Sequence, residues 1–265
     1  MKDERMQLLD GRHALVTGAS RGIGAEIARA MARAGAAVAL AARDTEALER
    51  VAEQITAEGG RALILPTDVS DPAAVEHMVA ATVDGLGGLE VAVNNAAGGG
   101  HWPTPLAEVQ PEQLRSALAI SLESVFLSMR HEIPAMLAAG GGSIVNMAST
   151  AGLEAVAGTA GYTAAKHGVI GLTKVAALDY AAHGIRVNAI APGPILTEQL
   201  AAAGEEWQRQ TRQGLPMQRI GRPAEVAAAC VWLCSDQASF VTGATLTIDG
   251  GKLAGTPASG AAGES

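Results

Sequence analysis

The sequence predicts an α/β fold: a single doubly wound domain with a seven-stranded parallel sheet and helices on both faces. Short apolar runs alternate with helical stretches along the chain, which indicates parallel β-α-β units. Nearly half of the 265 residues are apolar, mostly Ala, Val, Leu and Ile, and aromatic residues make up only 3%. Small and β-branched residues suit strands that are buried beneath closely packed helices.

The expected strands and helices follow one another in order. Strands are predicted at residues 13–17, 37–42, 62–66, 89–94, 143–148, 186–191 and 245–249. The stretches between them predict helices near residues 22–34, 45–58, 72–86, 111–138, 160–182 and 223–235. Asp71 followed by Pro72 is typical of a helix start, and Gly35 is typical of a helix end.

One domain is expected over residues 1–253, because no repeat or linker interrupts the alternation. The stretch 194–221 is the longest insertion, and it predicts either a lid over a binding site or a packed surface excursion. Residues 254–265 are rich in Gly, Ala and Ser, which predicts a flexible C-terminal tail.

Charge and composition exclude several classes of function. A formal net charge of −8 argues against a nucleic-acid partner, whereas a small anionic cofactor still fits, since helix N-termini bind phosphate. A charged N-terminal stretch and the lack of a long apolar segment predict a soluble cytoplasmic protein without a membrane contact. Cys230 and Cys234 share a helix face, but nothing completes a metal site, so we interpret them as core residues and expect no metal.

A glycine-rich segment, HALVTGASRGIG, follows the first predicted strand and opens the first predicted helix. Its glycines are Gly18, Gly22 and Gly24. Missing side chains let the chain turn sharply and let a pyrophosphate reach the free N–H groups of the helix N-terminus. Glycine-rich turns are common by themselves, but this position in the first β-α-β unit predicts dinucleotide binding.

The spacing TGxxxGIG resembles the cofactor loop of the short-chain dehydrogenase/reductase family, whose fold is Rossmann-type. The resemblance extends from about residue 11 to residue 251, through Asp68, NNAA at 94–97, Ser149, YTAAK at 162–166, NAIAPG at 188–193 and TIDGG at 247–251. It implies a nicotinamide-dependent oxidoreductase. The cofactor-binding residues that it implies are Gly18, Ser20, Arg21, Gly22, Ile23, Gly24, Arg43, Asp68, Val69, Asn95, Tyr162, Lys166, Pro192, Gly193, Ile195 and Thr197.

The end of the second predicted strand bears on the choice of cofactor. Enzymes that use NAD usually place an acidic residue there, which accepts from the ribose 2′-hydroxyl. Ala42 occupies that position, and Arg43 and Arg21 are suited to a 2′-phosphate unless they are ordinary surface arginines. We therefore expect NADPH (the NADP couple), with NAD as the alternative because Asp44 is one residue away. Asp68 contacts adenine by resemblance, or only stabilises a turn.

The proposed catalytic residues are Ser149, Tyr162 and Lys166. Tyr162 and Lys166 are four residues apart in a predicted helix and therefore share one face. A nearby cation favours a phenolate, so we expect Lys166 to lower the pKa of Tyr162 from about 10. The resemblance implies that Tyr162 transfers the proton, that Lys166 holds the nicotinamide ribose, and that Ser149 orients the substrate oxygen. A serine in this place is otherwise a cap or turn residue.

Two positions depart from the family pattern. Ser121 replaces an asparagine that helps to hold a water in a proton relay, and a serine can still bind water, so the relay is expected to be altered rather than lost. Ala97 replaces a glycine in NNAG and adds a methyl group near the nicotinamide.

The resemblance implies hydride transfer between the cofactor and a carbonyl or secondary alcohol, by a carbonyl reductase or alcohol dehydrogenase. The alternative is a cofactor-binding regulatory or scaffold protein with weak catalysis, which Ser121 favours. β-Ketoacyl, sugar or polyol, and general ketone substrates all share these motifs. Residues 98–105, 150–158 and 194–221 are expected to select among them. No role is assigned to His101, Trp102, Glu154 or Trp207 within these segments.

Subunit assembly is also implied by the resemblance. Family members commonly pair long helices such as those predicted at 111–138 and 160–182, and often pair the last strand as well. We therefore expect a homotetramer, with a dimer as the alternative.

Overall fold

The computed structural model describes residues 7–98, 101 and 103–255. Within them, one parallel sheet has the strand order β3-β2-β1-β4-β5-β6-β7. The strands are β1 (His13–Thr17), β2 (Ala37–Ala42), β3 (Ala62–Pro66), β4 (Val91–Asn94), β5 (Gly142–Met147), β6 (Ile185–Pro192) and β7 (Thr245–Ile248). The predicted fold class is confirmed, and the strand boundaries lie within two residues of those expected.

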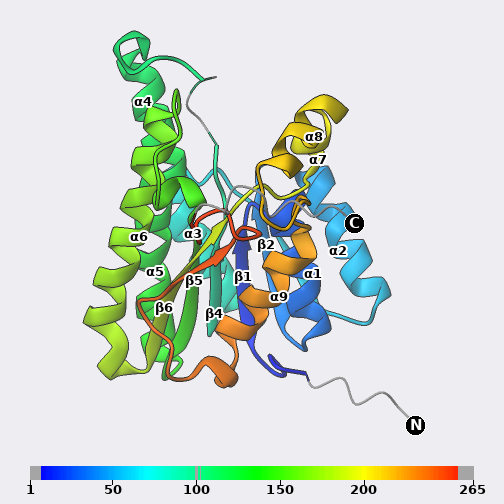
Figure 1. Ribbon diagram of the computed structural model, residues 1–265. Coiled ribbons are helices and arrows are strands. Elements are labelled where there is room, and N and C mark those ends of the chain that lie inside the picture. Colours follow the sequence, from blue (N-terminus) through cyan, green and yellow to red (C-terminus); the bar gives the residue numbers. More distant parts are fainter. Residues whose placement is uncertain (1–6, 99–100, 102, 256–265) are drawn as a thin grey trace.

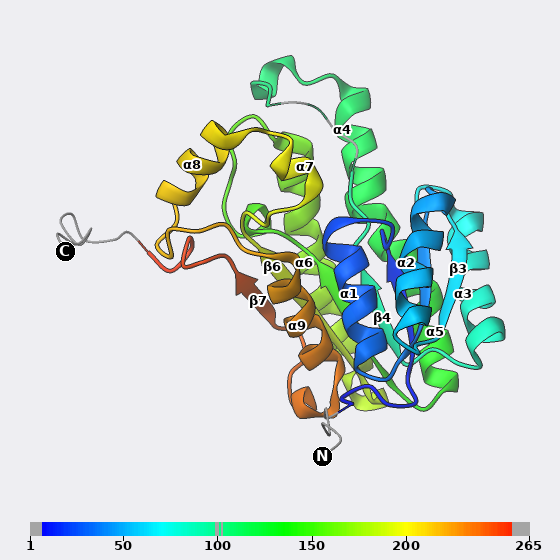
Figure 2. The same ribbon diagram turned by 90° about the vertical axis from the view of Figure 1, so that its right-hand side faces the viewer.

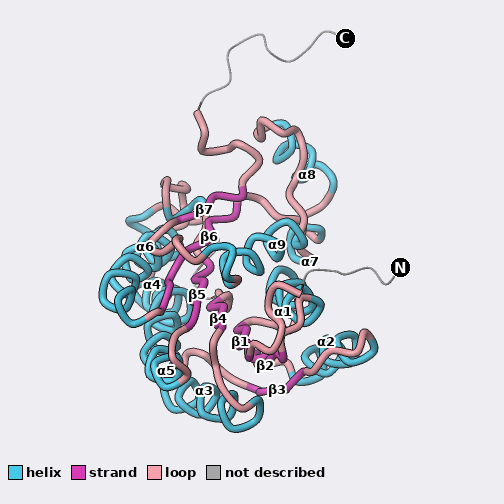
Figure 3. Tube along the Cα trace, turned by 90° about the horizontal axis from the view of Figure 1, so that it is seen from below, coloured by secondary structure: helices cyan, strands magenta, loops and turns pink. Residues whose placement is uncertain are grey.

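Helices cover both faces of the sheet (Figures 1 and 3). On one face lie α1 (Gly22–Arg33), α2 (Thr45–Ala57) and α9 (Pro223–Cys234). On the other lie α3 (Pro72–Leu86), α5 (Ser124–Ala138) and α6 (Ala160–Tyr180), with α4 (Pro111–Leu118) packed against α6. Asp71 caps α3 by accepting a hydrogen bond of 2.9 Å from the N–H of Ala73, as the sequence predicts.

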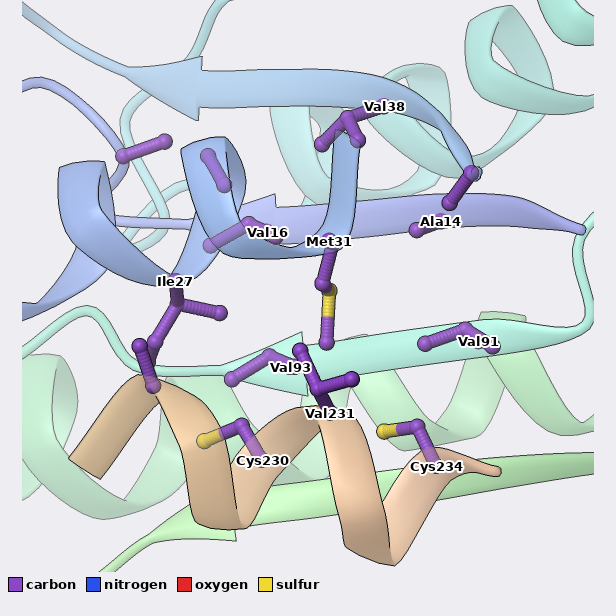
Figure 4. Close-up of a cluster of buried hydrophobic side chains, with 14 of the residues drawn as sticks. Ala14, Val16, Ile27, Met31, Val38, Val91, Val93, Cys230, Val231 and Cys234 are labelled. Carbon is purple, nitrogen blue, oxygen red and sulfur yellow. The ribbon is translucent and has the colours of Figure 1, made fainter. Parts of the chain in front are cut away.

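The core consists of two apolar layers, because alternate residues of each strand point to opposite faces. Val16 faces the layer beneath α1 and α9, and Leu15 faces the layer beneath α3, α5 and α6. Figure 4 shows Cys230 and Cys234 among the apolar side chains of the first layer. Both thiols are free and buried, and burial raises the pKa of Cys234 to about 12, so the interpretation of the two cysteines as core residues is confirmed.

The helix predicted over residues 111–138 is interrupted. A π-helical segment, Ala119–Glu123, separates α4 from α5. The Ser121 hydroxyl donates to the carbonyl oxygen of Gly98 over 2.9 Å and accepts from its N–H over 3.3 Å. Ser124 donates to the carbonyl of Ile120 over 2.6 Å. These hydroxyl bonds compete with the regular ladder, and such wide turns inside helices often occur at functional sites.

The predicted insertion at 194–221 contains two short helices, α7 (Glu198–Ala201) and α8 (Glu205–Gln213). Figure 2 shows them on the same side of the molecule as β7 and the segment that follows it. Leu215 is buried, so part of the insertion packs against the body, and its function as a lid stays a prediction. In the part of the chain that the structure describes, no helix is long and apolar enough to cross a bilayer. Trp102 and residues 256–265 of the predicted tail lie outside the described residues.

The strand order places a change of winding direction between β1 and β4. From β1 the chain proceeds outward through β2 and β3, and it then returns to build β4 to β7 on the opposite side. In open parallel sheets of this kind, ligands bind in the crevice at the carboxyl ends of the strands at such a switch point.

Candidate active site

A cavity of about 460 Å³ lies at this switch point. Its size is within the usual range for ligand pockets. The structure brings most of the predicted cofactor-binding residues together around it. They are Gly18, Ser20, Arg21, Gly22, Ile23, Gly24, Arg43, Asp68, Val69, Asn95 and Thr197.

The side chain of Asn95, in the loop after β4, holds the backbone of the glycine turn in place. Asn95 Nδ2 donates to the carbonyl oxygens of Thr17 and Gly18, over 3.0 and 3.3 Å. A Cβ atom at Gly24 would lie 2.1 Å from the Gly18 oxygen, so only glycine permits this approach. No side chain caps the N-terminus of α1, which leaves its first N–H groups for an anion. These features fit the pyrophosphate of a dinucleotide.

The opposite end of the cavity holds the residues that bear on cofactor choice. Ala42, Arg43 and Asp44 all line it. The Asp44 carboxylate caps α2 by accepting from Ala47 N–H over 3.0 Å. Asp68 accepts from the hydroxyl and N–H of Ser70, which lowers the pKa of Asp68, and the nearby Arg43 charge lowers it further. Asp68 therefore stabilises a turn and lines the cavity at once.

Several lining residues were not among the predicted cofactor contacts. They are Thr67, Ala96, Gly98, Ile120 and Glu198, while Ala97 was noted only as a departure from the family pattern. Thr67 follows β3 directly, so its position after a strand was a usable signal. Ile120 had none, because it reaches the cavity only through the π-helical segment, which the sequence did not predict.

Ser149, Tyr162 and Lys166 lie together beyond the end of β5. Ser149 begins the 3-10 turn η3 (Thr150–Gly152), and a side-chain hydrogen bond links it to Tyr162. Lys166 Nζ lies 5.7 Å from the centroid of the Tyr162 ring. Its ammonium donates to the carbonyl of Met147 over 2.7 Å, and burial lowers the pKa of Lys166 to about 8. The helical spacing thus places both side chains as expected.

The expected direction of the Tyr162 pKa shift was wrong. Burial raises the pKa of Tyr162, and the hydrogen bond with Ser149 opposes that rise. The Lys166 ammonium donates to the Met147 carbonyl over 2.7 Å and lies 5.7 Å from the centroid of the Tyr162 ring. The hydrogen bond with Ser149 is thus the contact that lowers the pKa of Tyr162 in this structure, and the expected influence of Lys166 on Tyr162 stays a prediction.

Three predicted cofactor contacts do not line the cavity: Pro192, Gly193 and Ile195. Pro192 ends β6, Gly193 N–H donates to the carbonyl of Ile248 over 3.0 Å, and Ile195 is buried in the core. Tyr162 and Lys166 also lie outside the cavity lining. The cofactor contacts of Tyr162 and Lys166 stay predictions.

The proton relay was expected to be altered by Ser121 rather than lost, and this stays a prediction. The Ser121 hydroxyl donates to the Gly98 carbonyl over 2.9 Å, and Ser121 is fully buried. Ser121 therefore joins the loop after β4, at the cavity wall, to the junction between α4 and α5.

Comparison with known proteins agrees with this geometry. Residues 18–252 match a family model described as enoyl-(acyl carrier protein) reductase. The chain is 43% identical over 252 residues to an A-factor type gamma-butyrolactone 1′-reductase (1S-forming) of Streptomyces virginiae, covering 94% of this chain and 98% of the relative. It is 42% identical over 237 residues to a cyclohexanol dehydrogenase of Acinetobacter sp. (strain SE19), covering 89% of this chain and 93% of the relative.

A solved structure supports the same assignment. The crystallised 7α-hydroxysteroid dehydrogenase, in complex with NADH and 7-oxo glycochenodeoxycholic acid, superposes with a TM-score of 0.89 at 34% identity, covering 95% of this chain and 98% of that one. The chain belongs to the short-chain dehydrogenase/reductase family. It is an oxidoreductase that transfers hydride with a nicotinamide cofactor.

Proposed function

We propose that this enzyme interconverts a secondary alcohol and a ketone, with Tyr162 as the acid and base and NADPH as the preferred cofactor. The observation that supports the proposal most is the grouping of Ser149, Tyr162 and Lys166 beyond the carboxyl end of β5, the edge of the sheet at which the cavity lies. The bound nicotinamide would supply or accept the hydride at the substrate carbon. The chain's own residues then have to orient the substrate oxygen and move one proton.

Each catalytic side chain has a distinct part in that task. In the reductive direction, the Tyr162 hydroxyl gives its proton to the carbonyl oxygen, and the hydrogen bond from Ser149 stabilises the phenolate that results. Lys166 holds a cation under the Tyr162 ring and, by resemblance, would hold the nicotinamide ribose. Burial lowers its pKa to about 8, which is still above neutral pH, so the ammonium form predominates.

The preference for NADPH rests on charge at the wall of the cavity. Arg21 and Arg43 line it, Ala42 offers no carboxylate, and the carboxylate of Asp44 accepts from the backbone of α2. Two guanidinium groups would suit a 2′-phosphate. NADH is the second candidate, because Asp44 lines the same cavity and the related hydroxysteroid dehydrogenase was solved with NADH.

Cyclic secondary alcohols are the substrate class that we propose. Cyclohexanol and hydroxysteroid dehydrogenases among the relatives act, by their names, on ring hydroxyls. Steady-state oxidation of cyclohexanol and reduction of cyclohexanone, each with both cofactor types, tests the proposal. Tight NADPH binding without turnover on a broad panel of ketones and alcohols would favour the regulatory or scaffold alternative.

A homotetramer is proposed, with a dimer as the alternative, and a cytoplasmic location stays a prediction. Large apolar side chains are exposed on α5, on α6 and on the outer edge of the sheet, including Phe126, Val175, Leu178 and Leu246. Val175 and Leu178 of α6 are 56% and 83% exposed, and a contiguous apolar surface on this helix would be suited to a partner subunit. Light scattering at micromolar concentration that shows a stable monomer would contradict this assembly.

A further inference from the structure

The hydrogen-bonded turn that begins at Ser149 extends beyond the 3-10 turn η3 and reaches Glu154. Ser149 Oγ accepts from the N–H of Ala151 over 3.1 Å, and the N–H groups of Leu153 and Glu154 both donate to the carbonyl of Thr150, over 2.9 and 3.0 Å. Ser149 and Glu154 are therefore the two ends of one hydrogen-bonded unit, which we call the serine turn (residues 149–154). A shift at Glu154 is transmitted to Ser149 through these bonds.

One side of the serine turn rests on α6. A Cβ atom at Gly152 would lie 2.6 Å from the carbonyl oxygen of Lys166, so the two backbones are in direct contact. This contact sets the distance between the turn and the helix that holds Tyr162.

The other side of the serine turn is held by Lys252. Its ammonium forms an ion pair with Glu154 Oε1 and lies 3.5 Å from Thr150 Oγ1. Glu154 and Lys252 are 98 residues apart, and their side chains are about one-third exposed. Thr150 is buried, with 4% of its surface exposed. No local feature of the sequence would place Lys252 here.

Lys252 itself projects from a rigid segment. Both carboxylate oxygens of Asp249 accept backbone hydrogen bonds of 2.9 Å, one from Gly251 and one from Leu253. The segment follows β7 directly, at the edge of the sheet shown in Figure 2. These hydrogen bonds fix the backbone on either side of Lys252, and its side chain reaches the serine turn from there.

We propose that Lys252 is a positioning residue for the reaction: through Glu154 and Thr150 it fixes the serine turn, so that the Ser149 hydroxyl meets Tyr162 and the substrate oxygen. This inference rests on the proposed function of Ser149 and Tyr162. An ion pair whose side chains are about one-third exposed adds little to stability, so a merely structural pair would have little effect on turnover. A small displacement of a catalytic group, by contrast, lowers turnover strongly.

The decisive experiment compares Lys252→Met with Arg12→Met in the full-length protein. Arg12 also forms a long-range ion pair, with Asp236 at 3.3 Å, but at the amino end of β1, away from the catalytic residues. With cyclohexanol as the probe, Lys252→Met should lower kcat about tenfold, since orientation is lost, and leave the dissociation constant for NADPH unchanged. Arg12→Met should leave both unchanged.

Two further measurements separate positioning from general weakening. The Ser149 hydrogen bond lowers the pKa of Tyr162, so Lys252→Met should move the pH profile of alcohol oxidation to higher pH. Glu154→Gln should act in the same direction. The exchanged pair, Lys252→Glu with Glu154→Lys, should recover most of the lost kcat, because the ion pair is restored with its charges reversed.

Unchanged kcat and an unchanged pH profile in Lys252→Met would overturn the proposal. So would a fall in kcat accompanied by an equal loss of NADPH affinity and a large drop in melting temperature. If the wild type binds NADPH but turns over no alcohol or ketone, the proposed function fails separately. Amide hydrogen exchange over residues 150–154 then decides for Lys252: faster exchange in Lys252→Met supports the link, and unchanged exchange refutes it.

Discussion

The two halves of the sheet bury very different side chains. Between residues 13 and 66, which build β1 to β3 with α1 and α2, Thr17 is the one polar side chain among the buried residues. Between residues 91 and 192, which build β4 to β6 with α5 and α6, the buried residues include Asn94, Glu132, Asn146 and Lys166. The half with β1 to β3 therefore has an apolar interior and carries the glycine turn, whereas the half with β4 to β6 has polar side chains in its interior.

This difference follows from what each half has to hold. A pyrophosphate can be bound by N–H groups that any sequence with suitable glycines provides, so the cofactor half needs few buried polar side chains. Proton transfer needs side chains in fixed places, and buried polar groups cost free energy unless they are paired. Asn94 Nδ2 donates to Glu132 and to Asn146, both over 3.0 Å, and Asn146 donates to Thr173 over 3.0 Å. This buried network lies under the catalytic group.

The largest expected effect belongs to the catalytic half. Tyr162→Phe removes only the hydroxyl and retains the ring packing. Turnover should fall by about a hundredfold or more, the usual contribution of a positioned acid. The dissociation constant for NADPH, measured by fluorescence titration, should stay within about twofold of the wild-type value, since other residues line the cavity. Wild-type turnover in this variant would remove Tyr162 from the mechanism.

The buried network gives the second prediction, a dependence of stability on pH. Burial raises the pKa of Glu132 to about 7, and its Oε1 and the Oδ1 of Asn94 have no hydrogen-bond partner. The folded protein therefore binds more protons than the unfolded chain between the ordinary carboxyl pKa of 4.5 and about 7. The free energy of unfolding is therefore highest below pH 4.5, and it falls as the pH rises from there to about 7, by up to about 3 kcal/mol.

Glu132→Gln cannot ionise and should lose this part of the pH dependence. Urea unfolding of the wild type and the variant at pH 5 and pH 7.5, at one protein concentration, measures the difference. The advantage of the variant over the wild type should be larger at pH 7.5. Glu53→Gln, at an exposed position of α2, is the control, and equal pH slopes for all three proteins would contradict the argument.

The contrast between the halves also explains how far the sequence could be interpreted. The glycine turn and the strand–helix alternation are local patterns, so the fold and most of the cavity lining were predicted from them. The π-helical segment at Ala119–Glu123 depends on Ser121 meeting Gly98, 23 residues away, and was missed. The pKa of Tyr162 was predicted in the wrong direction for the same reason, because burial, which depends on the packing of distant segments, raises it and outweighs the hydrogen bond with Ser149. Contacts between distant segments have no signature in a single sequence.

The third prediction tests whether the cofactor half depends on its backbone. Gly24→Ala places a methyl group where the carbonyl of Gly18 and the amide of Asn95 already lie, within 2.1 and 2.5 Å. It should destabilise the fold by about 1–3 kcal/mol and weaken NADPH binding at the same time. Gly171→Ala, in α6 with no atom near the added methyl, is the matched control and should stabilise by about 0.5–1 kcal/mol. Normal NADPH affinity in Gly24→Ala would show that the close approach is dispensable.

The smallest expected effect concerns a charged side chain of the cofactor half. Arg43 is exposed at the cavity wall, and only NADPH has a 2′-phosphate for it to meet. Losing one charge-assisted contact should raise the Michaelis constant for NADPH about tenfold in Arg43→Ala. The constant for NADH should hardly change, so the ratio of the two constants is the measurement. Arg50→Ala, an exposed arginine of α2 that does not line the cavity, should leave both constants unchanged. Equal effects of Arg43→Ala on the two cofactors would mean that recognition there is also a matter of the backbone, and the case for NADPH would be lost.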